Sequence, residues 1–135
     1  MHLHPRTWRR RAGAFPGNRV RIAVDRTIAG ADLYGGLIAL EPGAAVDLHW
    51  HRRGEIQYIL RGRGKLLHPD GRESQVVAGS AVFSPAGAAG AHGFRNSGRG
   101  ALEILFFYGA PGGRRPSMTL LAKDRRASRA PTRRS

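Results

Sequence analysis

Hydrophobic residues come in short runs that alternate with polar residues from about Val20 onward, and glycine, proline and Asp-Gly positions separate the runs. Alternation of this kind is typical of half-buried strands, and no competing pattern of a long helix is present. The pattern predicts an all-β domain. The predicted strands cover approximately residues 20–25, 33–41, 45–51, 55–60, 63–68, 72–77, 80–84, 91–96, 101–109 and 117–122.

Tight turns divide these strands. Pro69-Asp70-Gly71 joins two predicted strands as a hairpin, and Gly62 and Gly64 mark a second bend where a side chain would not fit. Short, evenly spaced strands favour a sandwich or a barrel. The length of 135 residues suits one domain with a single core.

The formal net charge of +14 raises the question of a nucleic-acid partner. The charge lies mainly at the two ends: residues 1–21 carry six arginines and no acid, and residues 114–135 carry seven arginines and one lysine against one acid. Because the middle of the chain is nearly neutral, both ends are interpreted as mobile, solvated extensions. We therefore do not expect nucleic acid as the main partner, and polyanion binding by the tails stays an alternative.

The chain has no cysteine, so any strong metal ligands must be histidine, aspartate or glutamate. No apolar stretch approaches the roughly 18 residues that a membrane-spanning helix needs. The arginine-rich start also lacks the apolar run of a secretory signal. We expect a cytoplasmic protein with no membrane association.

Four side chains are candidate metal ligands. His49 and His51 alternate along one predicted strand, so both imidazoles point to the same side. Residues 52–54 turn the chain, and Glu55 then opens the next strand and supplies an oxygen beside the two nitrogens. A third imidazole is available from His92 if its distant strand returns to the site.

Two motifs between residues 43 and 96 carry a family resemblance. The first is a glycine, five residues, His-x-His, three residues, a glutamate, six residues and a glycine: Gly43, His49, His51, Glu55 and Gly62. The second is a glycine, five residues, Pro-x-Gly, a histidine and an asparagine: Gly79, Pro85, Gly87, His92 and Asn96. Both resemble the motifs of the cupins, although four residues separate Gly87 from His92 where the common pattern has two.

The resemblance implies an antiparallel jelly-roll barrel, or double-stranded β-helix, over residues 18–122. A basic N-terminal arm at residues 1–17 and a basic, disordered C-terminal tail at residues 123–135 would flank it. The resemblance also implies one metal ion near a mouth of the barrel, with His49, His51, Glu55 and His92 as its ligands, and often a homodimer. Three imidazoles and a carboxylate suit a divalent transition metal, which would be Fe, Mn, Ni, Co, Cu or Zn.

Several functions are compatible with such a site. An enzyme of the dioxygenase, isomerase, cyclase or lyase type would act on a small oxygen-rich molecule at the open positions of the metal. The alternative is a non-catalytic module that binds or senses a small ligand, because fold alone does not select a reaction.

Further interior candidates follow from strand alternation. Gln57 and Asp47 share the predicted inner face with the candidate ligands, and Phe94 joins them from a later strand. Gln57 either binds a substrate oxygen or supports a ligand histidine. Tyr34 becomes a possible proton donor if its strand crosses the mouth of the barrel.

Overall fold

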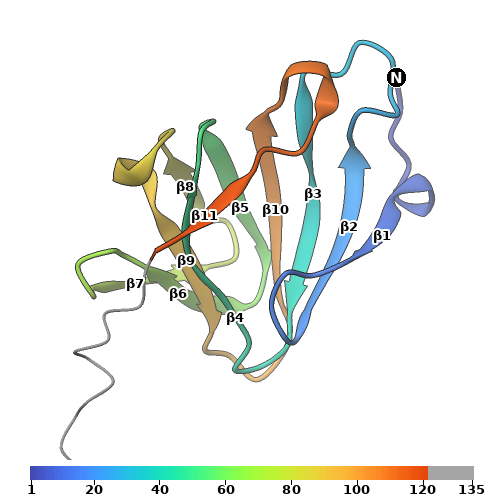
Figure 1. Ribbon diagram of the computed structural model, residues 1–135. Helices are drawn as coiled ribbons and strands as arrows, with labels where there is room; N and C mark the ends of the chain where they lie inside the picture. The colour runs from blue at the N-terminus through green and yellow to red at the C-terminus, as the bar shows by residue number, and fades with distance from the viewer. Residues whose placement is uncertain (122–135) are drawn as a thin grey trace, which may run out of the picture.

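The structure is a computed structural model that describes residues 1–121, and it consists of two antiparallel sheets that face each other (Figure 1). The first sheet has the order β1 (Arg9–Ala12), β2 (Asn18–Val24), β3 (Leu33–Leu40), β10 (Leu102–Gly109), β5 (Glu55–Arg61) and β8 (Ala81–Ser84). The second has the order β11 (Met118–Leu120), β4 (Ala45–His51), β9 (His92–Asn96), β6 (Arg63–Leu67) and β7 (Glu73–Val77).

Three short 3-10 helices complete the described part of the chain: η1 (Pro5–Thr7), η2 (Ala88–Gly90) and η3 (Pro111–Gly113). None of the helices within residues 1–121 has the length and apolar character needed to cross a membrane.

Strands that are distant in the sequence lie next to each other, as β3 does beside β10 and β4 beside β9. Two facing antiparallel sheets in which strands distant in the sequence pair in this way are characteristic of a jelly roll. The predicted all-β jelly-roll class is therefore confirmed. Each of the ten predicted strands has a counterpart, from β2 to β11.

The first strand was not predicted. Arg9–Ala12 contains no alternation of apolar and polar residues, yet it pairs with β2 in a regular antiparallel register from Arg9↔Ile22 to Ala12↔Arg19. The expectation that the whole arm of residues 1–17 is mobile is therefore wrong for this segment, because backbone hydrogen bonding to a sheet edge does not require apolar side chains. The expected tail at residues 123–135 lies outside the described residues.

The main core lies between the two sheets. Leu40, Ile59 and Leu102 have no exposed surface, and Ile104 and Phe94 are almost as deeply buried. A smaller cluster of Ile22, Tyr34, Tyr108 and Ala110 packs along β2, β3 and β10.

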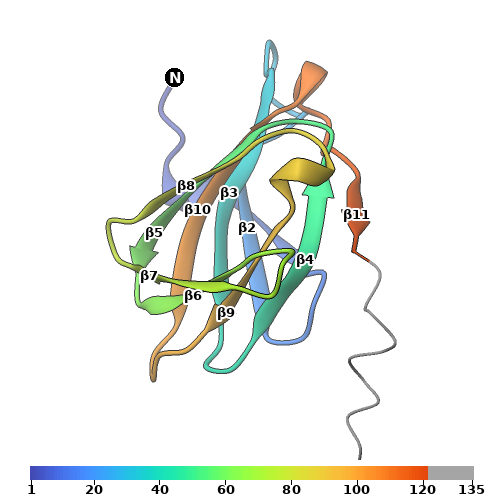
Figure 2. The ribbon, with the colours of Figure 1, turned by 90° about the vertical axis from the view of Figure 1, so that its left-hand side faces the viewer.

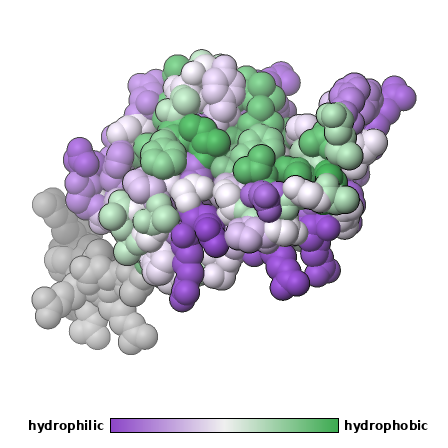
Figure 3. Space-filling view, turned by 90° about the horizontal axis from the view of Figure 1, so that it is seen from above, coloured by the Kyte–Doolittle hydropathy of each residue, from purple (hydrophilic) through white to green (hydrophobic). Residues whose placement is uncertain are grey.

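One crossing segment determines how the site is built. After η3, residues 114–117 run from the first sheet to the second, where Met118 pairs with His51 and Leu120 with His49. We call residues 114–117 the strap. Figure 2 shows β4 ending beside η2 and β11 at the same end of the molecule. Viewed onto this end in Figure 3, hydrophobic groups gather in the middle and hydrophilic groups surround them.

Candidate metal centre

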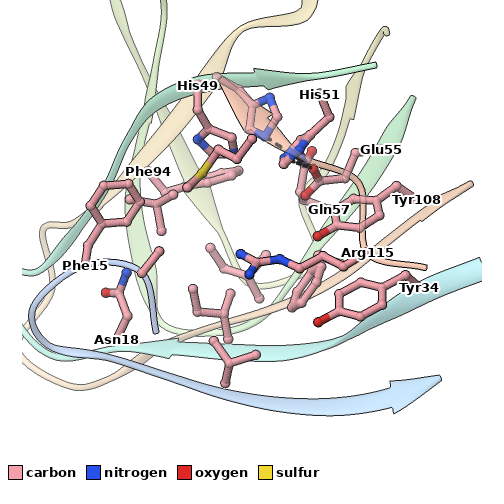
Figure 4. Close-up of a pocket in the computed structure, with 18 of the residues that line it drawn as sticks. Phe15, Asn18, Tyr34, His49, His51, Glu55, Gln57, Phe94, Tyr108 and Arg115 are labelled. Atoms are coloured by element: carbon pink, nitrogen blue, oxygen red, sulfur yellow. Dashed lines mark ion pairs between the residues drawn. The ribbon is translucent and has the colours of Figure 1, made fainter. Parts of the chain in front are cut away.

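The four candidate ligands meet in the structure. One ligand atom from each of His49, His51, Glu55 and His92 lies within 4.8 Å of the others. The side chains come from β4, β5 and β9, which belong to both sheets, and each residue is only 5–6% exposed. Figure 4 shows His49, His51 and Glu55 at one side of the cavity between the sheets.

Backbone carbonyl groups orient all three imidazoles. Nδ1 of His49 lies 2.7 Å from the carbonyl oxygen of Asp47, and Nδ1 of His92 lies 2.9 Å from that of Gly90. Nδ1 of His51 lies 3.2 Å from the carbonyl oxygen of Ser117 in the strap. Because a carbonyl only accepts, each Nδ1 must be the protonated donor. In the neutral imidazole, Nε2 therefore carries the lone pair, which is the state that binds metal.

Glu55 is placed opposite these lone pairs. Its Oε2 lies 3.2 Å from Nε2 of His51 and 3.5 Å from Nε2 of His92. The same oxygen is buried and has no hydrogen-bond partner among residues 1–121. A carboxylate oxygen facing imidazole lone pairs is unfavourable unless a proton or a cation lies between them. The cluster therefore requires a positive charge at its centre.

The pKa values reflect this coupling. Burial, and after it the nearby His92, lower the pKa of His49 to about 4, so His49 is neutral at physiological pH. Burial raises the pKa of Glu55, but the hydrogen bonds and positive charge that a proton on the facing nitrogens of His51 and His92 supplies outweigh this effect and bring it to about 2. Burial lowers the pKa of His92, whereas the Glu55 carboxylate raises it, and the net direction is upward.

The residues fit a divalent transition metal. Three neutral imidazoles and one ionised carboxylate are borderline ligands of the type that Mn, Fe, Co, Ni, Cu and Zn accept. The hydrogen bonds from each Nδ1 to a carbonyl are the usual support of metal-binding histidines.

The unusual spacing before His92 is accommodated by η2. The two additional residues fold into the turn Ala88–Gly90, and the amide of Gly87 donates to the carbonyl of His51 at 2.7 Å. A Cβ on Gly90 would approach the carbonyl oxygen of Pro85 to 1.8 Å, so only glycine permits this packing. The turn closes compactly and His92 emerges opposite His49 in the β4–β9 pairing.

Three other predicted interior residues have different outcomes. Gln57 is 1% exposed, lines the cavity, and its amide lies 3.3 Å from the hydroxyl of Ser84. Tyr34 also lines the cavity, where it stacks on Tyr108 with ring centroids 5.5 Å apart. The interior placement of Asp47 is wrong: β4 has a register shift between Val46 and His49, and Val46 lines the cavity instead. Such an irregularity interrupts simple alternation.

The cavity beside the cluster has a volume of about 90 Å³ and a mainly apolar wall. Its lining includes Phe15, Phe94, Phe106 and Met118, together with Arg11 and Arg115. Sequence reasoning missed both arginines because they lie in the two basic ends, whose charges looked solvated. The one available signal was that Arg115 lies two residues before the predicted strand at residues 117–122, and Arg11 had no comparable signal.

Tyr108 lies beside the cluster. Its ring centroid lies 5.0 Å from that of His51, and the residue is 5% exposed. Burial raises the pKa of its hydroxyl, and the charge of Glu55 adds to the effect, so the group stays protonated.

Comparisons with known proteins agree on the fold. The polyketide cyclase RemF from Streptomyces resistomycificus superposes with a TM-score of 0.74 and 24% sequence identity, over 93% of this chain and 87% of that one. A deletion mutant of the Bacillus subtilis oxalate decarboxylase OxdC superposes with a TM-score of 0.69 and 24% identity. That match covers 87% of this chain but only 31% of the decarboxylase chain. At these identities the likeness shows the fold.

No curated protein sequence matches the chain. A family profile described as the cupin domain matches residues 36–108, which is more than half of the chain and contains all four clustered side chains. The profile match, the two-sheet topology and the structural neighbours all lead to one assignment: this chain belongs to the cupin family.

Proposed function

We propose that the protein is a metal-dependent cupin enzyme that holds one divalent transition metal through His49, His51, Glu55 and His92 and acts on a small oxygen-rich molecule. The carrying observation is the buried Glu55 oxygen, which faces the Nε2 atoms of His51 and His92 without a hydrogen-bond partner within residues 1–121. A divalent cation satisfies the carboxylate and the lone pairs together.

The surroundings of the cluster support reaction with a ligand. A metal bound there would act as a Lewis acid on an oxygen atom of the ligand. The protein supplies a mainly apolar cavity that limits water, and the buried Gln57 amide lies in its wall as a hydrogen-bonding group. Tyr34 and Tyr108 add hydroxyl groups that can donate to a ligand oxygen. The solved neighbours include a cyclase and a decarboxylase, and the decarboxylase has Mn(II) centres.

A non-catalytic binding module is the second candidate. Glu55 is the only carboxylate residue that lines the cavity among residues 1–121, and it belongs to the metal cluster. A wall without a second carboxylate suits binding as well as turnover. Ligand recovery after incubation with metal-loaded protein distinguishes the two: an enzyme converts the ligand, and a binding module returns it unchanged.

Metal content tests the proposal directly. The measurement is elemental mass spectrometry on protein purified without a histidine tag. We expect close to one equivalent of a transition metal in the wild type and a loss of most of it in His49→Ala and His92→Ala, because each substitution removes one of four ligands. His68→Ala is the matched control, since His68 bonds to Ser74 outside the cluster and its loss leaves metal content unchanged.

Two results would contradict this proposal. A wild-type protein that stays metal-free after incubation with Mn, Fe, Co, Ni, Cu and Zn salts contradicts the metal proposal. Full metal content in His49→Ala contradicts the ligand assignment.

The homodimer is also part of the proposal. Four large hydrophobic side chains project from the outer face of β5 and β8: Ile56, Tyr58, Leu60 and Phe83, with exposed fractions between 42% and 68%. We call them the outer apolar face. Contiguous apolar surface of this kind is typical of protein interfaces, and a second copy of the chain supplies a matching surface.

A further inference from the structure

Arginine side chains gather beside the barrel cavity. A cleft of about 670 Å³ adjoins it, and its lining includes six arginines and one carboxylate residue: Arg9, Arg10, Arg11, Arg26, Arg114, Arg115 and Asp25. Arg9 pairs with Asp25, and within residues 1–121 none of the other five forms an ion pair with a carboxylate. The cleft therefore has a strong net positive charge. Concentrated charge of one sign in a cleft attracts ligands of the opposite sign.

The cleft and the cavity meet at three side chains. Arg11, Tyr34 and Arg115 line both spaces. A guanidinium nitrogen of Arg11 donates to the Tyr34 hydroxyl, which fixes the position of this arginine. Figure 4 shows the Arg115 side chain reaching into the cavity between Glu55 and Tyr34. A ligand that extends from the cleft toward Glu55 therefore passes these two guanidinium groups.

Contacts on both sides of Arg115 fix the backbone of the strap. Before it, the amide of Ala110 donates to the carbonyl of Asp32, and a Cβ on Gly113 would come within 2.6 Å of the Asp25 backbone. After it, Ser117 receives a hydrogen bond from His51, and Met118 pairs with His51 in β11. Fixing the backbone on both sides reduces the entropy that Arg115 loses when it binds a ligand.

The cleft and the cavity offer a ligand two different kinds of contact, charged and apolar. Guanidinium groups bind carboxylate and phosphate oxygens through paired, charge-assisted hydrogen bonds. Beyond the arginines, the wall is mainly apolar, with the aromatic rings of Phe94 and Phe106. The volumes, about 90 Å³ in the cavity and about 670 Å³ in the cleft, allow only a compact group next to the His and Glu side chains of the cluster.

We propose that the protein binds an organic oxyanion whose compact apolar part enters the barrel cavity while Arg11 and Arg115 hold its carboxylate or phosphate group at the boundary with the cleft. This inference rests on the proposed function, since it defines the substrate class of the same metal site. Arg11 and Arg115 are specificity-determining residues that position the ligand relative to the proposed metal site.

Three small molecules that share a phenyl ring and differ in charge test whether the ligand must be an anion. Isothermal titration calorimetry measures the dissociation constants of benzoate, phenyl phosphate and the neutral benzamide. We expect at least one anion to bind about tenfold or more tightly than benzamide, which corresponds to about 1.4 kcal/mol. Preference for benzoate or for phenyl phosphate identifies the oxyanion. Equal binding of all three probes, or no binding of either anion, overturns the proposal.

Matched arginine variants locate the anion. Arg115→Gln and Arg11→Gln are expected to weaken anion binding about tenfold or more and to leave benzamide binding unchanged. Arg114→Gln is the control: it removes the same charge from the cleft, but Arg114 does not line the cavity. We expect a change of less than about twofold for this control, in line with an exposed charge that does not reach the cavity. An equal loss in Arg114→Gln means that only the general charge of the cleft attracts the anion, and this contradicts the proposal.

Repeating the titrations with metal-stripped and metal-loaded protein separates this inference from the metal proposal. The effect of Arg115→Gln on anion binding is expected in both forms, and the metal content of the variant is expected to equal that of the wild type. A wild type that takes up no metal after incubation with the metal salts, yet shows the arginine effect, refutes only the metal proposal. Normal metal content with no arginine effect refutes only the oxyanion proposal.

Discussion

At the scale of single residues, Asp25 joins the N-terminal arm to the body of the protein. Its carboxylate pairs with Arg9 of β1 and accepts hydrogen bonds from the hydroxyl and the amide of Thr27. Burial raises the pKa of Asp25, but the hydrogen bonds from Thr27 and the charge of Arg9 outweigh it, so the net direction is downward. The ionised carboxylate is therefore favoured in the folded state and contributes stability.

This coupling predicts a pH-dependent stability. A lowered folded-state pKa gives stability that is present above the ordinary value of 3.8 and is lost as the pH falls through the folded-state pKa. We expect Asp25→Asn to lower the free energy of unfolding at pH 7 by about 1 kcal/mol. The difference from the wild type should shrink toward zero below the ordinary pKa, as measured by urea unfolding over a pH series.

Asp70→Asn is the control for this experiment. Asp70 also pairs with an arginine, Arg72, but both side chains are more than half exposed, so water screens the interaction. A difference between Asp25→Asn and wild type that stays constant down to low pH contradicts the assigned coupling.

Asn96 shows a structural role for a residue of the second motif. Its amide nitrogen donates to the carbonyl groups of Leu40 and Gly100 at 2.9 and 2.8 Å, and its oxygen accepts from the amide of Gly98. The side chain is 2% exposed and connects β9 to the turn before β10 and to the end of β3. We expect Asn96→Ala to destabilise the fold by about 1–3 kcal/mol, because buried backbone groups lose their partners.

Metal content separates this structural role from a role in the site. The variant should unfold at a lower urea concentration and, while folded, bind the same equivalents of metal as the wild type. Loss of metal without loss of stability would place Asn96 in the site rather than in the framework.

At the scale of elements, β5 carries the core and the site on one face. Glu55, Gln57 and Ile59 point inward and are buried, whereas Ile56 and Leu60 point outward and are exposed. The alternation lets one strand supply a metal-ligand candidate, a cavity amide and a core residue at successive inward positions. The site is therefore supported directly by the packing of the barrel.

Two substitutions on this strand test the division between its faces. Ile59→Ala should reduce the free energy of unfolding by about 2–5 kcal/mol, since it removes methyl groups from a fully buried side chain and leaves a cavity. Leu60→Ala, at the adjacent outward position, should change it by less than about 0.5 kcal/mol when both substitutions are made in a Phe83→Asp background, which separates the proposed dimer and leaves Leu60 exposed. Urea unfolding followed by circular dichroism measures both. Similar losses in the two variants contradict the assigned faces.

At the scale of the whole molecule, the outer apolar face predicts association. Phe83 is 68% exposed and lies opposite Ile56 in the β5–β8 pairing. We expect the wild type to be a dimer by light scattering and Phe83→Asp to be a monomer, because an aspartate would have to be buried in the contact. Val77→Asp is the control: Val77 is 47% exposed but lies on β7 of the other sheet. A monomeric wild type, or dissociation in both variants, contradicts this contact.

The whole molecule also explains why the basic ends matter for the cavity. Arg11 lies on β1 and Arg115 in the strap, and these segments approach the cavity from opposite ends of the described chain. Their charges lie beside a mainly apolar wall, where a guanidinium group interacts more strongly with an anion than it does in bulk water. The arrangement depends on tertiary folding at both ends.

The sequence determined the all-β class, the ten strands from β2 to β11 and the four clustered side chains. These features follow from local rules: alternation fixes which side chains share a face of β4 or β5, and glycine and proline positions fix the turns. The spacing of His49, His51 and Glu55 predicted most of the cluster because all three lie on two strands that are consecutive in the sequence, β4 and β5. His92 required the family resemblance, since thirty-six residues separate it from Glu55.

Tertiary structure alone decided the rest. The irregular β4–β9 register moved Asp47 out of the cavity and Val46 into it, and no local pattern specifies a change that depends on a partner strand. Likewise, β1 forms because a sheet edge offers backbone hydrogen bonds, which are independent of side-chain pattern. The approach of Arg11 and Arg115 to one cavity depends on long-range packing. Composition records how much charge a chain carries, but only the fold decides where that charge meets an apolar wall.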